Sequence, residues 1–84
     1  MIIPEVLNGV VDDRVYINGV LQKAFQLVEV DGDFYFINDG NNRIAKNITL
    51  YLSEKYVVGK TFSDGSTLSA GYYYFDNNGK MVLD

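Results

Sequence analysis

A short pattern occurs three times along this chain and limits what it can fold into. Each copy is an aromatic-rich stretch of strand-forming residues followed by Asn or Asp and Gly, at residues 15–19, 34–40 and 73–79. The central tyrosines Tyr16, Tyr35 and Tyr74 are 19 and then 39 residues apart. These spacings are close to one and then two periods of about 20 residues, which predicts a repeat array. Such arrays usually bind other molecules on the surface that their stacked units create.

Turn signals between the apolar stretches indicate that each repeat is a β-hairpin. Asn18-Gly19 separates two short apolar runs, and Asp31-Gly32 separates two longer ones. Two-residue hairpin turns need positive φ at both positions, which Asn, Asp and Gly adopt most readily. The sequence therefore predicts an all-β fold, a short solenoid-like array of stacked antiparallel β-hairpins. Residues 1–84 are expected to form a single domain of three to four hairpins, with clear units at about 14–24, 25–46 and 71–83.

The segment 47–70 follows this pattern least. Ile48, Leu50 and Leu52 occupy alternate positions, which favours a strand with one buried face. A helix through residues 48–58 is the alternative, because apolar residues of this stretch also occur at helical spacing. We favour the strand, since Thr, Tyr and Val are common in this stretch and favour strands. Residues 60–71 are expected to be a long, turn-rich connection.

Composition restricts how so small a domain can be stabilised. The 84 residues include no Cys and no His, so disulfides and the commonest zinc sites are excluded. Seven Tyr and five Phe provide aromatic packing instead, within one chain or between chains. The start of the chain, with Pro4 and Asn8-Gly9, is expected to be a lead-in segment outside the core.

Charge and hydropathy argue against two classes of partner. The net charge is −4 and no basic patch is present, so nucleic acid is not expected as a partner. No apolar run approaches the roughly 18 residues of a membrane span. Residues 1–4 are not expected to begin a signal peptide, because they lack a charged start and a long apolar stretch. A cytoplasmic protein and a module of a longer exported chain both fit these features.

Residues 22–36 and 71–82 resemble the cell-wall-binding repeats of surface proteins of Gram-positive bacteria and their phages. That family includes the choline-binding and glucan-binding repeats. Residues 71–82 contain a Tyr-Tyr-Tyr-Phe strand, an Asp-Asn-Asn-Gly turn and a Lys-Met-Val exit that match the second half of the family's pattern. The resemblance covers residues 15–45 and 71–83. It implies a non-catalytic module of a secreted or cell-surface protein that binds a cell-wall polysaccharide or another glycan.

The resemblance also implies which side chains would hold a ligand. In the choline-binding branch, Trp and Tyr of successive hairpins surround the quaternary ammonium, and Trp offers the best cation–π face. This chain has no Trp, and the family's Gly-Trp pair is replaced by Ala24-Phe25, which counts against choline. Sugar rings can stack on Tyr and Phe. The candidate ligand-binding aromatic residues are Tyr16, Phe25, Phe34, Tyr35, Tyr73 and Tyr74.

Strand alternation divides the aromatic side chains into two rows. Successive strand residues face opposite sides, so the repeat alignment places Tyr16, Tyr35 and Tyr74 on one face. The other face would carry Phe34, Phe36, Tyr73 and Phe75. Either row could be exposed for stacking on a ligand. Alternatively, both rows could pack between hairpins, because two-stranded units are not stable alone.

Catalytic and metal sites are not expected. The three glutamates, Glu5, Glu29 and Glu54, show no pairing of the kind that glycoside hydrolysis needs. The serines have no His to activate them. The clusters of Asp and Asn lack the spacing and closing Glu of a calcium loop, and we interpret them as turn residues. No enzymatic activity and no cofactor is therefore predicted.

Two other hypotheses remain open. Strand edges without partners invite pairing with another copy, and neither end has an obvious polar cap. A structural spacer or self-assembling module, forming a homo-oligomer without its own ligand, is therefore the second hypothesis. The third is a small intracellular β protein that binds a protein partner through residues 47–69.

Overall fold

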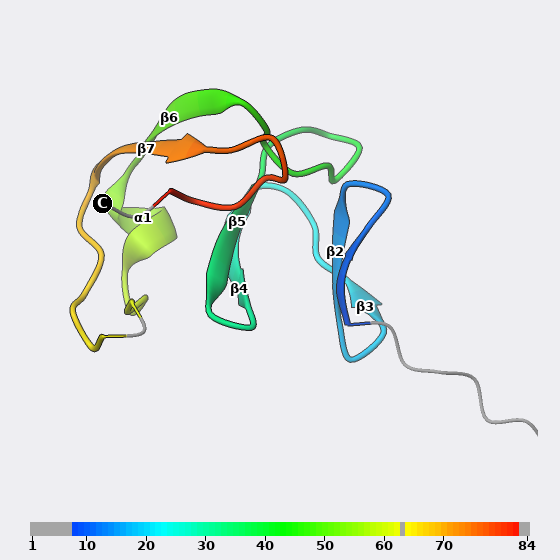
Figure 1. Ribbon diagram of the computed structural model, residues 1–84, viewed down its shortest axis with the longest axis horizontal. Helices are drawn as coiled ribbons and strands as arrows, with labels where there is room; N and C mark the ends of the chain where they lie inside the picture. Colours follow the sequence, from blue (N-terminus) through cyan, green and yellow to red (C-terminus); the bar gives the residue numbers. More distant parts are fainter. Residues whose placement is uncertain (1–7, 63, 83–84) are drawn as a thin grey trace, which may run out of the picture.

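The computed structural model describes residues 8–62 and 64–82, which form a mostly β fold with one short helix (Figure 1). The elements are β1 (Gly9–Val11), β2 (Arg14–Ile17), β3 (Val20–Leu21), β4 (Gln26–Val30), β5 (Asp33–Ile37), β6 (Ile48–Leu52), α1 (Glu54–Val57) and β7 (Gly71–Phe75). Antiparallel pairing gives three small sheets, β1-β2-β3, β4-β5 and β6-β7. Among the described residues no helix is long and apolar enough to cross a membrane.

The two predicted hairpin turns are confirmed. Asn18 and Gly19 have φ values of 52° and 80°, and Asp31 and Gly32 have values of 53° and 85°. Strands β2 and β3 pair across the first turn, and β4 and β5 pair across the second. Positive φ at both central residues matches the right-handed twist of the flanking strands, which explains the choice of Asn, Asp and Gly.

A third two-residue turn, at Asp12-Asp13, was not predicted. These residues have φ values of 52° and 64°, which Asp tolerates better than most residues. The turn allows Val11 to pair with Arg14, so residues 9–11 form β1. The start of the chain therefore contains a strand that was not predicted, but residues 9–11 belong to neither core, as expected, and residues 1–7 lie outside the described residues.

Segment 47–70 contains both of the elements that were weighed for it. Residues 48–52 form the expected strand, and the chain then turns into α1, so a strand extending to residue 58 is wrong. The helical turn brings Val57 into the same core as Leu52. Strand β6 pairs with β7, although residues 53–70 lie between them. In the expected last hairpin, 71–83, Phe75 pairs with Met81 and the N–H of Val82 donates to Tyr74 O at 2.8 Å, while residue 83 lies outside the described residues.

The β4-β5 hairpin lies between the other two sheets, and each of its faces packs against a different neighbour. One face contributes Leu27, Phe34 and Phe36 to a core that also contains residues of β6, α1 and β7. The opposite face contributes Val28, Tyr35 and Ile37 to a second core, with Val15 and Ile44. Alternation along one aromatic strand therefore fills two cores (Figure 1).

Matching hydrogen bonds define equivalent positions in the three units. These bonds, each 2.8 Å long, run from Gln22 N to Val15 O, from Ala45 N to Phe36 O and from Val82 N to Tyr74 O. Tyr16, Ile37 and Phe75 are therefore equivalent: they pair with Leu21, Ile44 and Met81 across the turn that follows each of them. Tyr35 lies two residues before Ile37, which preserves the direction of its side chain, whereas Tyr74 lies one residue before Phe75, which reverses it. The predicted common face for Tyr16, Tyr35 and Tyr74 is therefore not formed.

Candidate functional site

The outer face of the β6-β7 sheet presents three tyrosines. Tyr51 lies opposite Tyr72, and Thr49 lies opposite Tyr74, so these side chains point to the same side. The exposed fractions are 57% for Tyr51, 77% for Tyr72 and 43% for Tyr74. The rings of Tyr51 and Tyr72 meet edge to face with their centroids 5.2 Å apart. We call Thr49, Tyr51, Tyr72 and Tyr74 the tyrosine face.

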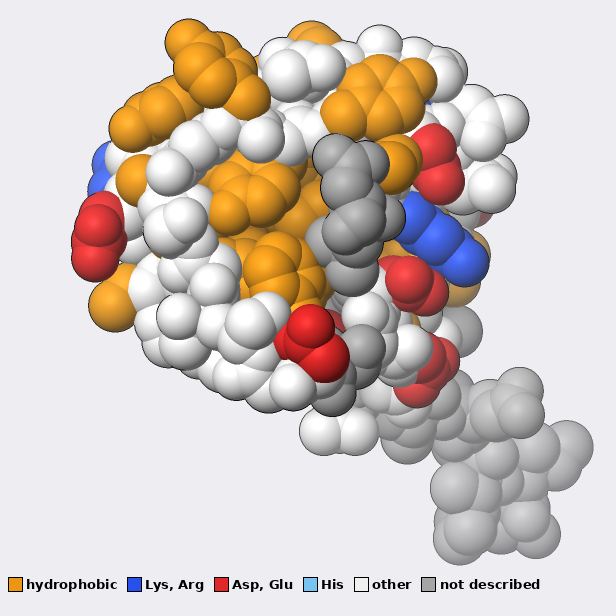
Figure 2. Space-filling view, turned by 60° about the vertical axis from the view of Figure 1, so that its left-hand side comes forward, with side chains coloured by type: hydrophobic (Ala, Val, Ile, Leu, Met, Phe, Trp, Pro, Cys, Tyr) orange, Lys and Arg blue, Asp and Glu red, His pale blue; other side chains and the backbone are white. Residues whose placement is uncertain are grey.

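Packing of the opposite side explains why this face points outward. Leu52 and Phe75 are buried in the larger core, and Leu50 and Tyr73 pack against that core. The Tyr73 hydroxyl donates a hydrogen bond to the carbonyl oxygen of Ser69 at 2.5 Å. Since strand residues alternate, burial of this row forces its neighbours into solvent. Figure 2 shows hydrophobic side chains protruding at the top of the molecule, where β6 and β7 lie in Figure 1.

The ligand-binding residues predicted from the sequence do not form one surface. Phe34 and Tyr35 are 2% and 7% exposed and belong to different cores, so neither ring can stack on a ligand. Both are buried because the middle hairpin is covered on each face. Tyr16 and Tyr73 are half-buried. Of the six candidates, Tyr74 lies on the tyrosine face and Phe25 is exposed elsewhere.

Phe34, Phe36, Tyr73 and Phe75, which were predicted to share one face, come together in one core between two sheets. Phe34, Phe36 and Phe75 lie in one core, and Tyr73 packs against it. The rings of Phe36 and Phe75 are 6.4 Å apart between centroids. This row packs between units, as the structural alternative proposed, and is not available to a ligand.

Sequence reasoning missed two of the three tyrosines on the tyrosine face, Tyr51 and Tyr72. Each is next to a core residue, so alternation alone marks both as outward-facing. Their proximity depends on the pairing of β6 with β7. No turn signal reveals that pairing, because residues 53–70 separate the two strands.

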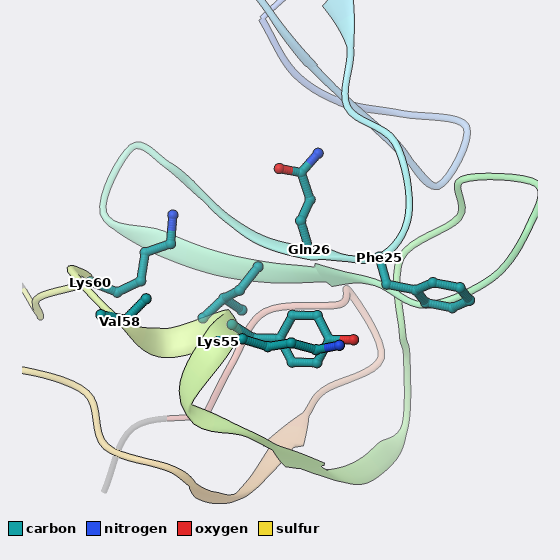
Figure 3. A pocket seen from close by; sticks show the side chains of 7 residues that line it. Phe25, Gln26, Lys55, Val58 and Lys60 are labelled. Atoms are coloured by element: carbon teal, nitrogen blue, oxygen red, sulfur yellow. The ribbon is translucent and has the colours of Figure 1, made fainter.

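A second feature is an open hollow between the start of β4 and α1. It has a volume of about 500 Å³ and is lined by Phe25, Gln26, Leu27, Lys55, Tyr56, Val58 and Lys60. Figure 3 shows Phe25 and Gln26 on the β4 side, and Lys55, Val58 and Lys60 on the side of α1 and the segment after it. The Lys55 ammonium lies 4.9 Å from the centroid of the Tyr56 ring. We call this site the α1 hollow.

The carboxylates of two turns are engaged with the backbone. Asp39 accepts hydrogen bonds from the backbone N–H groups of residues 41 and 43, at 2.8 and 3.1 Å. Asp76 accepts from those of residues 78 and 80, at 2.8 and 3.0 Å. These contacts support the interpretation of these acidic residues as turn residues.

Within residues 8–62 and 64–82, no three of the His, Cys, Asp and Glu side chains are grouped as a metal site would require.

Two ionisable side chains have shifted pKa values. Burial, followed by the negative charge of Asp33, raises the pKa of the Tyr35 hydroxyl above its usual value. Hydrogen bonds from Ser66 lower the pKa of the exposed Asp64 carboxyl. Neither residue belongs to the tyrosine face or lines the α1 hollow, so these shifts do not indicate acid–base chemistry at either feature.

Two surface features of the described residues, the tyrosine face and the α1 hollow, could each bind a ligand. The tyrosine face offers aromatic rings on a flat sheet, and the α1 hollow offers apolar walls beside two amino groups. No protein-family model, no curated protein and no solved structure matches this chain.

Proposed function

We propose that this chain is a non-catalytic glycan-binding module of a secreted or phage-associated protein, and that it binds a cell-wall polysaccharide through the tyrosine face. The observation that carries the proposal is the exposure of three tyrosines on one side of a two-stranded sheet. Contiguous exposed aromatic groups of this kind mark interaction sites on soluble domains. Tyrosine suits this role, because it offers a large contact area at a low cost in conformational entropy.

The proposed binding mechanism follows from the two kinds of surface that a sugar ring offers. Its face exposes C–H groups, which pack against an aromatic ring, and its edge carries hydroxyls. A tyrosine has an apolar body and a polar tip, so it can contact both parts. The hydroxyl of Thr49, opposite Tyr74, adds a further donor and acceptor. A shallow surface of this kind binds each sugar weakly, and several modules on one polymer would supply the affinity.

Contacts between units support a solenoid-like arrangement, which would present such surfaces in series. Ile44, which follows the turn at residues 38–43, donates its N–H to Asp13 O, next to β2 of the first unit, at 2.8 Å. The residue after the last turn, Met81, donates its N–H to Phe34 O of the second unit at 2.9 Å. The second and third units are thus each joined to the preceding unit by a backbone hydrogen bond, and the donors, Ile44 and Met81, occupy equivalent positions.

An NMR titration with soluble peptidoglycan fragments and β-glucan oligosaccharides tests the proposal. We expect the amide signals of residues 49–51 and 72–74 to shift, and tyrosine fluorescence to change with the same midpoint. Both responses should disappear in the double variant Tyr72→Thr/Tyr74→Thr, since Thr preserves strand preference but removes the rings. Shifts confined to other elements, or no shift with any of these glycans, would contradict the proposal.

Self-assembly is the second candidate function, and one observation favours it. Among the described strands, β6 pairs only with β7, so its other edge is open beside the tyrosine face. Open edges can pair with another copy of the same chain. Sedimentation velocity over a wide concentration range distinguishes the two functions. A dimer that dissociates in the Tyr72→Thr/Tyr74→Thr variant would favour assembly, whereas a monomer throughout would exclude it.

A further inference from the structure

We infer that the α1 hollow binds an anionic sugar unit, one that carries a carboxylate or a phosphate. This inference rests on the proposed glycan-binding function and specifies the class of sugar. The hollow and the tyrosine face lie on neighbouring elements, because β6 leads directly into α1 (Figure 1).

The charge of the hollow opposes that of the whole molecule. The chain has a net charge of −4, yet both charged residues that line the hollow, Lys55 and Lys60, are cationic. Lys46 and Lys80 form ion pairs with Asp13 and Asp33, at 2.8 and 3.5 Å. In the part of the chain that the structure describes, Lys55 and Lys60 have no such carboxylate within ion-pair distance. Their positive charge is therefore available to an anionic ligand.

Apolar side chains at the hollow provide a surface for the ring of the sugar. Phe25 is 57% exposed on the β4 side, and Val58 is 65% exposed on the α1 side. Leu27 and Tyr56 also line the hollow. The Tyr56 ring is held from behind by Phe36, edge to face at 5.1 Å between centroids. An apolar lining with a few placed polar groups is typical of ligand sites.

Polar groups at the hollow suit an anion. Gln26 contributes no side-chain group to this purpose, because its side chain points away from Lys55 (Figure 3) and donates its amide N–H to the carbonyl oxygen of Lys23 at 2.8 Å. The Lys55 ammonium is positioned beside the Tyr56 ring. A quaternary ammonium would be repelled by the two lysines, so the site selects anionic over cationic ligands.

Calorimetric titration with matched oligosaccharides tests this inference. A hyaluronan tetrasaccharide carries carboxylates, and its methyl ester has the same rings without the charge. We expect the acid form to bind about tenfold more tightly than the ester, which corresponds to about 1.4 kcal/mol, because partly exposed ion pairs are individually weak. The preference should decrease as salt is raised. Glucose 6-phosphate is the phosphate arm: binding that is lost in Lys55→Gln/Lys60→Gln would support phosphate as the anion, and absence of binding would overturn that half of the inference.

Substitutions assign the effect to the hollow. The variant Lys55→Gln/Lys60→Gln should lose the preference for the acid form, while Arg43→Gln, an exposed cation outside the hollow, should keep it. Equal affinities for acid and ester, or an acid preference that survives in Lys55→Gln/Lys60→Gln, would overturn the inference and leave neutral glycan binding at the tyrosine face intact. Failure of the acid, the ester and glucose 6-phosphate to bind would overturn the inference, whereas the proposed function is contradicted only if the peptidoglycan fragments and β-glucans also fail to bind.

Discussion

Gly79, in the last turn, lies against the middle unit. It has a φ of +83°, and a Cβ atom added to it would overlap Ile44 Cδ1 and lie 3.3 Å from Ala45 O. Two separate requirements therefore exclude a side chain here. One is the left-handed backbone, and the other is the space occupied by the exit strand of the preceding unit.

Replacing Gly79 with Ala should therefore destabilise the fold strongly. We expect a loss of about 2–4 kcal/mol in the free energy of unfolding, from backbone strain and overpacking together. Gly59→Ala is the matched control, because Gly59 has a φ of +75° and nothing within 4 Å of an added Cβ. It should lose only about 1 kcal/mol. Equal losses in urea denaturation would contradict the close contact with Ile44.

Tyr35 links stability to alkaline pH. Its folded pKa is raised, first by burial and then by Asp33, so the folded state favours the neutral hydroxyl. The resulting stability is fully present below the unfolded pKa of about 10 and is lost as pH rises through the folded pKa. We expect the free energy of unfolding to fall more steeply above that pH in the parent than in Tyr35→Phe. Parallel curves for the two proteins would rule out this contribution.

At the scale of elements, two turns follow one rule. Asp39 and Asp76 each accept hydrogen bonds from the second and fourth backbone N–H groups that follow them. The residues after both turns also make equivalent ladder bonds. A carboxylate in this position fixes the turn that starts the exit strand.

Asp39→Ala and Asp76→Ala should each cost about 1–2 kcal/mol, because two backbone donors lose their acceptor. Asp→Asn at either position keeps the side-chain carbonyl oxygen and should retain most of the stability. Thermal unfolding of the four variants measures this difference. If Asn is as damaging as Ala at both positions, the turns do not depend on these hydrogen bonds.

Elements that depend on neighbouring residues could be predicted from the sequence, whereas elements that depend on contacts between distant segments could not. The turns at Asn18-Gly19 and Asp31-Gly32 follow from two residues each, and both form as expected. Strand β1 was missed, since Asp12-Asp13 is a weaker turn signal than a pair with Gly. Helix α1 was weighed only as part of a longer helix, 48–58, and was not favoured, because the burial of Val57 beside Leu52 is not visible in local propensity. The tyrosine face required a pairing between distant strands that the sequence does not state.

The whole molecule is two cores that share one hairpin. Val15 belongs to the core between the first and second units, and Leu52 belongs to the core between the second and third. Contacts of this kind, between successive units only, give repeat proteins stability that is partly local. Tyr35 and Phe36 lie in different cores although they are adjacent, so the β4-β5 hairpin couples them.

Val15→Ala should therefore destabilise the β1-β2-β3 sheet more than the β6-β7 sheet. We expect it to cost about 2 kcal/mol and to accelerate amide hydrogen exchange in β1–β3 more than in β6-β7. Leu52→Ala is the reciprocal control and should act mainly on β6-β7. Uniform acceleration over all strands in both variants would show a single cooperative unit instead.

Retention on insoluble, protein-free cell walls of a Gram-positive bacterium tests the central proposal, binding through the tyrosine face, most directly. The parent is compared with Tyr72→Thr/Tyr74→Thr and with Val10→Thr/Val20→Thr, which removes apolar groups that are 37% and 61% exposed on the first sheet. The proposal predicts that the parent and the valine variant are retained, while the tyrosine variant, folded by circular dichroism, is washed through. Equal retention of all three proteins, or retention of none, would contradict it.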